Sequence, residues 1–213
     1  MWKQLGQRVG QEARHDRHRE GHHAVRHETR PEGGNLAGQH LKTADAILIS
    51  SDLVTGGRTS IDLSGNQLCG VWTQYGQQHG TYTAEGIAAI AEALRVKGSL
   101  TVANLLGNQL DAESAKMLTK VAKQKGISLC GIQRDQTTAD FRHKDLKPPD
   151  AILLASDLSQ ADVTGGLTSL NLADTQLCGL WTDYYGQHGT YNTEGITAIA
   201  DALRVNGSLT EME

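Results

Sequence analysis

Hydrophobic positions along this chain alternate between short clusters with apolar residues two apart and longer stretches with helical spacing. In the first such cluster Ile61 and Leu63 are followed by Asn66. The same spacing recurs at Ala103, Leu105 and Asn108 and at Leu170, Leu172 and Thr175, and more weakly around Ile127–Ile132 and Ala139–Leu146. Apolar residues two apart are typical of a strand with one buried face, and an amide can bond the backbone where the strand turns away. We therefore expect several short, similar strands.

The stretches between these clusters predict helices. Apolar residues at 87, 90, 91 and 94 share one helix face behind Thr83, a candidate N-cap, and residues 192–204 repeat the pattern. A third helix is expected from its cap Asp111 to near Gly126, and shorter ones over 45–53 and 150–158. Strands that alternate with helices indicate an α/β fold.

A long internal repeat organises the chain. Residues 45–101 and 150–210 are identical at about 40 of 57 aligned positions, with Ser159–Asp162 inserted in the second copy. The offset is 105 residues before that insertion and 109 after it. Two folded domains could give this pattern, and so could one array of smaller strand–helix units. The triplicated strand pattern favours the array.

These motifs resemble the leucine-rich repeats of the ribonuclease-inhibitor type, which also occur in nucleotide-binding innate receptors and Ran GTPase activators. The resemblance covers about 36–213 and implies an irregular α/β solenoid with a curved parallel sheet and outer helices. Units of that class run near 28 residues. Leu105 follows Leu63 by 42, so we expect an insertion at about Gly70–Thr83. The resemblance carries no catalytic residue.

Charge separates the N-terminal end from the rest. Residues 1–44 hold 8 Lys/Arg and 5 Asp/Glu, whereas residues 45–213 hold 12 and 19. Residues 1–35 are rich in His and Arg and poor in large apolar side chains, so we expect a disordered basic tail. Nucleic-acid binding through this tail is a second alternative function that its interleaved acids make less favourable. The absence of a signal-like or membrane-spanning apolar stretch and the odd count of three cysteines favour a cytoplasmic protein.

Seven of the nine aromatic residues fall in the two inserted loops. Such rings either pack locally or form a recognition patch, because Tyr and Trp dominate binding hot spots. The candidate aromatic binding residues are Trp72, Tyr75, Tyr82, Trp181, Tyr184, Tyr185 and Tyr191.

No residue pattern indicates catalysis or a cofactor. Cys69 with His79, and Cys178 with His188, offer two ligands per loop where zinc normally takes four. A Cys–His nucleophile would also need an orienting group and an oxyanion site, and neither is recognisable. We therefore expect no catalytic residue, no bound metal and no cofactor.

The resemblance implies binding through the concave sheet face, at the variable positions beside the inward leucines. These positions are Ser60, Asp62, Ser64, Val102, Asn104, Leu106, Ser169, Asn171 and Ala173. The expected function is non-catalytic protein–protein interaction within the cell, with regulation of a small GTPase of the Ran type as the first alternative. The sequence stops part-way through a further strand pattern, which suggests an incomplete array that could self-associate through an uncapped end.

Overall fold

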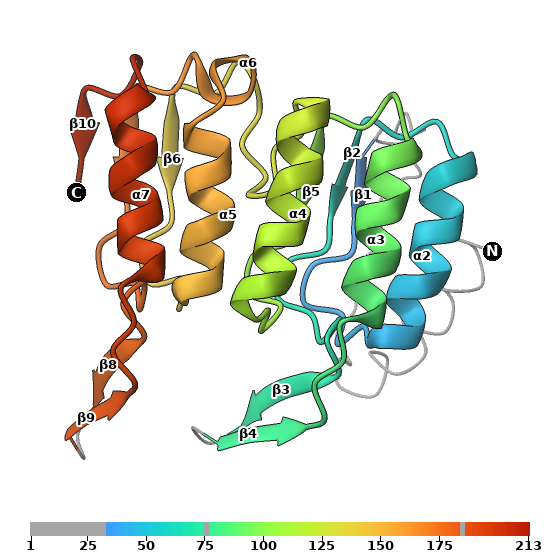
Figure 1. The fold of residues 1–213 in the computed structure, drawn as a ribbon, viewed down its shortest axis with the longest axis horizontal. Helices are drawn as coiled ribbons and strands as arrows, with labels where there is room; N and C mark the ends of the chain where they lie inside the picture. Colours follow the sequence, from blue (N-terminus) through green and yellow to red (C-terminus); the bar gives the residue numbers. More distant parts are fainter. Residues whose placement is uncertain (1–32, 75–76, 184–185) are drawn as a thin grey trace, which may run out of the picture.

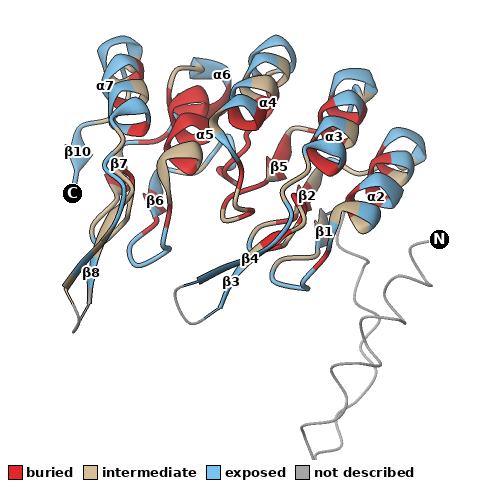
Figure 2. Cartoon of the chain, turned by 60° about the horizontal axis from the view of Figure 1, so that its bottom comes forward, coloured by how far each residue is buried: buried red, intermediate tan, exposed pale blue. Residues whose placement is uncertain are grey.

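The computed structural model describes residues 33–74, 77–183 and 186–213, and in these ranges the chain is a mixed α/β protein. Figure 1 shows the helices side by side in one layer with the short strands behind them, and Figure 2 shows the two layers from another side. This arrangement confirms the expected α/β class with parallel strands.

Short parallel strands form two sheets. The first has the order β1 (Gly33–Asn35), β2 (Ser60–Asp62), β5 (Val102–Asn104), and the second has the order β10 (Glu211–Met212), β7 (Ser169–Asn171), β6 (Thr138–Asp140). Gly34 pairs with Ile61, and Ile61 pairs with Ala103, so equivalent positions of the strand pattern lie side by side. The expected weak strand near Ala139 is present as β6.

The helices pack in chain order, each against the next. They are α2 (Thr43–Thr55), α3 (Glu85–Val96), α4 (Ala112–Lys125), α5 (Pro148–Leu158) and α7 (Glu194–Val205), with a short α6 (Ala161–Thr164) after α5. The four-residue insertion in the second copy supplies the two residues before α6 and the first two residues of α6. Because α4 packs against both α3 and α5, this single helix links the two sequence copies.

Helix ends follow local chemistry. Asp111 is the N-cap of α4, as expected, and its carboxylate accepts a hydrogen bond from the Ser114 N–H at 2.7 Å. Gly126 ends that helix in the left-handed conformation, at φ 63°. The expected cap Thr83 instead precedes the N-cap Ala84, and its hydroxyl accepts from the Glu85 N–H at 3.3 Å.

The hydrophobic core lies between the helix layer and the strands. The strand-pattern residues Leu63 and Leu105 are fully buried, as are the helix residues Ile87 and Leu118. Burial of a side chain of this size stabilises the fold by roughly 1.5–3 kcal/mol. The apolar residues of the strand pattern and those of the helix pattern therefore pack together in one continuous core.

The boundary of the N-terminal tail differs from the expectation. Residues 33–35 form β1 and pair with β2, and they were assigned to the tail because Gly33-Gly34-Asn35 carries no apolar side chain. Backbone hydrogen bonds to β2 hold this strand, and the sequence pattern contains no sign of them. Residues 1–32 lie outside the described residues.

The two inserted aromatic loops, one in each sequence copy, form β-hairpins. The first pairs β3 (Val71–Gln74) with β4 (Gln77–Gly80), and the second pairs β8 (Leu180–Asp183) with β9 (Gly186–Gly189), all antiparallel. Figure 1 shows both hairpins projecting from the same side of the molecule. The insertion expected at Gly70–Thr83 is therefore present and has a regular structure of its own.

Candidate functional site

An Asn or Asp occupies the last position of five of the six described parallel strands and fixes the turn that follows. In each case the side-chain Oδ1 accepts a hydrogen bond from the backbone N–H two residues later. The pairs are Asn35–Ala37 (3.1 Å), Asp62–Ser64 (2.9 Å), Asn104–Leu106 (3.3 Å), Asp140–Arg142 (3.0 Å) and Asn171–Ala173 (2.9 Å). These bonds hold a row of polar side chains at the carboxyl ends of the parallel strands.

A groove of about 370 Å³ runs across four of these strands. Its lining comes from β1, β2, β5, β6 and the segment 130–136. The polar lining residues are Asn35, Ser60, Asp62, Asn104, Gln133, Gln136 and Asp140, and Phe141 adds an aromatic ring. Among the described residues that line the groove, the only charged side chains are the two acids, Asp62 and Asp140.

The structure brings some of the expected binding residues together at this groove and separates others. Ser60, Asp62, Val102 and Asn104 line it, although Val102 is buried. Leu106 is also buried, so it offers little surface. Ser64 lies beyond the end of β2, and Ser169, Asn171 and Ala173 belong to the second sheet or the turn after it.

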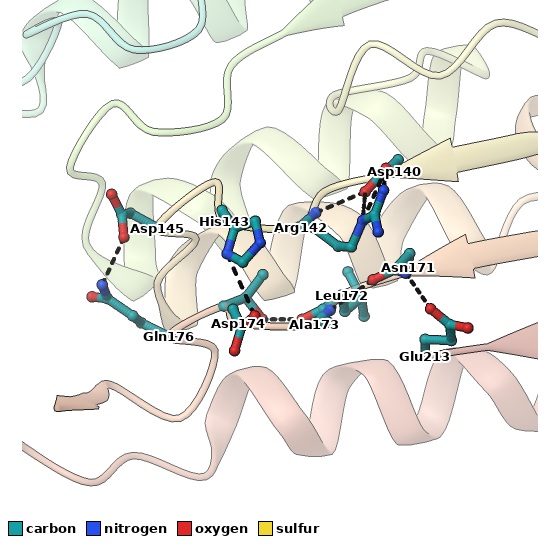
Figure 3. Close-up of polar contacts among 11 residues, drawn as sticks. Asp140, Arg142, His143, Asp145, Asn171, Leu172, Ala173, Asp174, Gln176 and Glu213 are labelled. Atoms are coloured by element: carbon teal, nitrogen blue, oxygen red, sulfur yellow. Dashed lines mark hydrogen bonds and ion pairs between the residues drawn. The ribbon is translucent and has the colours of Figure 1, made fainter.

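Sequence reasoning missed the groove residues between 130 and 141, because the strand pattern is weak there. Gln133 and Gln136 lie in a turn in which the Gln136 amide oxygen accepts from the Gln133 N–H at 3.1 Å. The Arg142 guanidinium donates three charge-assisted bonds to the Asp140 carboxylate, and Figure 3 shows this contact. The contact lowers the pKa of the Asp140 carboxyl. The one signal in the sequence that could have found these residues was Asp140, an Asx residue at the end of a strand pattern like Asp62 and Asn104.

A buried aspartate of α5, Asp157, binds the segment that follows β5 beside the groove. Ser128 bridges to β5, and the next two N–H groups have no strand partner. The Asp157 carboxylate accepts bonds from the N–H of Leu129 (2.9 Å) and of Cys130 (3.0 Å) and from the Ser128 hydroxyl (2.7 Å). Burial raises the pKa of Asp157 to about 6 despite these donors. The Asp157 side chain thus takes the place of a neighbouring strand as hydrogen-bond acceptor for the N–H groups of Leu129 and Cys130.

The aromatic loop residues have several environments. Trp72 stacks on His79 at 5.7 Å between ring centroids, and Trp181 stacks on His188 at 5.5 Å. Tyr82 is half-buried, whereas Tyr191 is 64% exposed. Tyr75, Tyr184 and Tyr185 lie outside the described residues.

The first Cys–His combination is divided between the core and a hairpin, and Cys178 of the second is half-buried. Cys69 is buried and burial raises its thiol pKa to about 11, whereas His79 belongs to the exposed hairpin strand β4. Across residues 33–74, 77–183 and 186–213, no group of three or more His, Cys, Asp or Glu is arranged to hold a metal ion.

Within the same ranges, none of the helices is both long and apolar enough to cross a membrane. The chain matches no protein-family model, and it matches no curated protein.

Proposed function

We propose that residues 33–213 form a segment of a leucine-rich-repeat solenoid of the ribonuclease-inhibitor type, and that its groove binds another protein without catalysis. The alternation of one short parallel strand with one helix supports this proposal. The spacing also supports it, since the hairpin β3–β4 accounts for the surplus residues between Leu63 and Leu105.

Two buried asparagines add further support. The Asn66 amide donates to the carbonyls of Leu36 and Leu63, both at 2.9 Å. The Asn108 amide makes the equivalent bonds one unit later, to Leu63 and Leu105 at 2.9 Å. A ladder of this kind satisfies the carbonyls where successive strands turn toward their helices. Thr175 performs part of this role in the second copy, through a bond to the Leu172 carbonyl at 2.7 Å.

The groove is the observation that carries the functional proposal. It presents the amides of Asn35, Asn104, Gln133 and Gln136, the Ser60 hydroxyl and two carboxylates, and the Asx turns hold several of these groups in place before binding. Preorganised polar groups suit a polypeptide partner, because less side-chain entropy is lost on binding. The acceptor-rich lining favours a partner segment that offers N–H donors and, to a lesser extent, positive charge.

We also propose an intracellular location. All three cysteines are free, and Cys69 and Cys130 are buried. Reduced thiols of this kind suit a reducing compartment.

Site-specific photo-crosslinking tests the groove. A benzoylphenylalanine placed at Gln133, which is exposed and lines the groove, should capture a defined protein from cells that express the full chain. The same group at Lys120, which is exposed on α4 in the helix layer, is the matched control and should not capture that protein. Equal capture from the two positions would contradict binding in the groove.

A further inference from the structure

The two sequence copies place identical residues in different surroundings. Helix α7 is the twin of α3, with an offset of 109 residues. Ile87 on α3 is fully buried, whereas its twin Ile196 on α7 is 47% exposed. The same difference holds for the buried Ala91 and Leu94, whose twins Ala200 and Leu203 are exposed and half-buried.

Helix α4 covers this face of α3. Its buried residues include Ala115 and Leu118, and it packs directly on α3. Figure 1 shows α4 beside α3, while the far side of α7 has only the short strand β10 near it. The sequence of α7 retains the apolar residues that α3 uses for this packing, so the face of α7 has the composition of a covered surface.

A tyrosine adds specific chemistry to the face. The Tyr82 hydroxyl bonds the Ser114 hydroxyl at 2.7 Å and accepts from the Asp111 N–H at 3.3 Å, so it recognises the capped N-terminus of α4. Its twin Tyr191 is 64% exposed. Tyr82 therefore contacts a helix that begins with Asp-x-x-Ser, and Tyr191 has the same position one copy later.

Strands β5 and β10, which also correspond in the two copies, differ in the same way. Strand β10 is the twin of β5, whose outer edge pairs with the segment after α4. Those bonds run from Ala103 N–H to Ser128 O (2.8 Å) and from Leu105 N–H to Leu129 O (2.9 Å). Among the described residues β10 is an edge strand that pairs with β7, so its other edge is available for a parallel strand.

We propose that the face formed by Tyr191, Ile196, Ala200, Leu203 and the edge of β10 docks a partner segment of the α4 kind. The occupant is an amphipathic helix that begins with Asp-x-x-Ser and leads into a strand parallel to β10. The α4 of a second copy is not free to occupy this face, because it is already packed between α3 and α5 of that copy. The proposal is independent of the groove.

The first test uses a synthetic peptide of residues 105–132 added to the full chain. Labelled peptide should bind saturably, and it should slow nitration of Tyr191 by tetranitromethane, measured by mass spectrometry. Ile196→Asp should weaken binding at least tenfold, whereas Val96→Asp, at an exposed position of α3, should not. A peptide carrying Asp111→Ala and Ser114→Ala should bind more weakly than the parent peptide, because it lacks the cap that Tyr191 would meet.

A second measurement does not require a free peptide to fold on binding. Glu213 is the twin of Asn104, so residues 105–132 repeated directly after Glu213 continue the register. In this extended chain the nitration rate of Tyr191 should fall to that of Tyr82, and Ile196→Asp should restore it. The proposal is overturned if Tyr191 reacts equally fast with and without the added segment in both experiments.

Discussion

Asp52 and Asp157 occupy the same position in the two sequence copies but have different surroundings. Asp157 is fully buried and accepts bonds from Ser128, Leu129 and Cys130, whereas Asp52 on α2 is half-exposed. The difference arises because α4 and its following segment cover α5, while no described unit covers the equivalent face of α2. A residue's energetic role here depends on the neighbouring unit as much as on its own identity.

This difference predicts a pH dependence of stability. The pKa of Asp157 is raised from 3.8 to about 6 in the folded chain, so between these values the folded state binds more protons than the unfolded state. Protonation therefore stabilises the fold, and Asp157 should contribute about 2 kcal/mol more to the free energy of unfolding at pH 4 than at pH 7. Urea denaturation from pH 7 to pH 4 measures this slope.

An asparagine variant provides the control for that slope. Asp157→Asn should remove the Asp157 part of the pH dependence. Asp150 is also buried with a raised pKa, so a residual slope in the same direction should persist in Asp157→Asn. An unchanged slope in Asp157→Asn would show that the carboxyl is not perturbed as described.

At the scale of elements, the hairpins depend on glycines beneath their tryptophans. Gly80 has φ +87°, and a Cβ there would lie 2.1 Å from the Gly70 carbonyl oxygen and 2.8 Å from the Trp72 ring. We expect Gly80→Ala to destabilise the hairpin by about 1–3 kcal/mol, because both the backbone conformation and the space are incompatible with a side chain.

The NMR shifts of the His79 ring protons measure the effect, since they carry the ring current of the stacked Trp72. Gly80→Ala should move them toward the values of an unstacked histidine. Gly98→Ala is the matched control, because a Cβ at Gly98 meets no atom within 4 Å. Retention of the Trp72–His79 shift pattern in Gly80→Ala would contradict this account of the hairpin.

The sequence alone predicted those elements in which the spacing of apolar residues matches the residues buried in the structure. Ile87, Ile90 and Leu94 are all fully buried, which is why the α3 helix was readable. Strand β1 was missed because Gly33-Gly34-Asn35 has no apolar side chain and joins its sheet through backbone pairing. The hairpins were expected only as insertions because their polar strands are largely exposed. The groove residues Gln133 and Gln136 lie in a turn, and their proximity to Asn35 and Asp62 depends on tertiary packing.

At the scale of the whole molecule, α4 determines whether the two copies behave as one folding unit. Leu118 is fully buried in α4. We expect Leu118→Ala to lower the free energy of unfolding by about 2–5 kcal/mol, through lost burial and the cavity left behind. Val96→Ala, at a residue 55% exposed, should change it by less than about 0.5 kcal/mol.

Denaturation of these two variants should be followed by circular dichroism and by tryptophan fluorescence. Trp72 and Trp181 report on opposite copies, so coincident transitions at a lower urea midpoint are expected for Leu118→Ala. Two separated transitions in the wild-type chain would mean that α4 does not couple the copies.

The most direct test of the central claim is the affinity of the partner captured at Gln133 for groove variants of the full chain. Ser60→Arg and Gln133→Arg place a large cation in the groove at positions that do not cap a strand turn. Calorimetry with the purified partner should show at least tenfold weaker binding for both, and unchanged binding for Lys120→Glu in the helix layer. Wild-type affinity in both groove variants, or equal loss in Lys120→Glu, would contradict recognition through the groove.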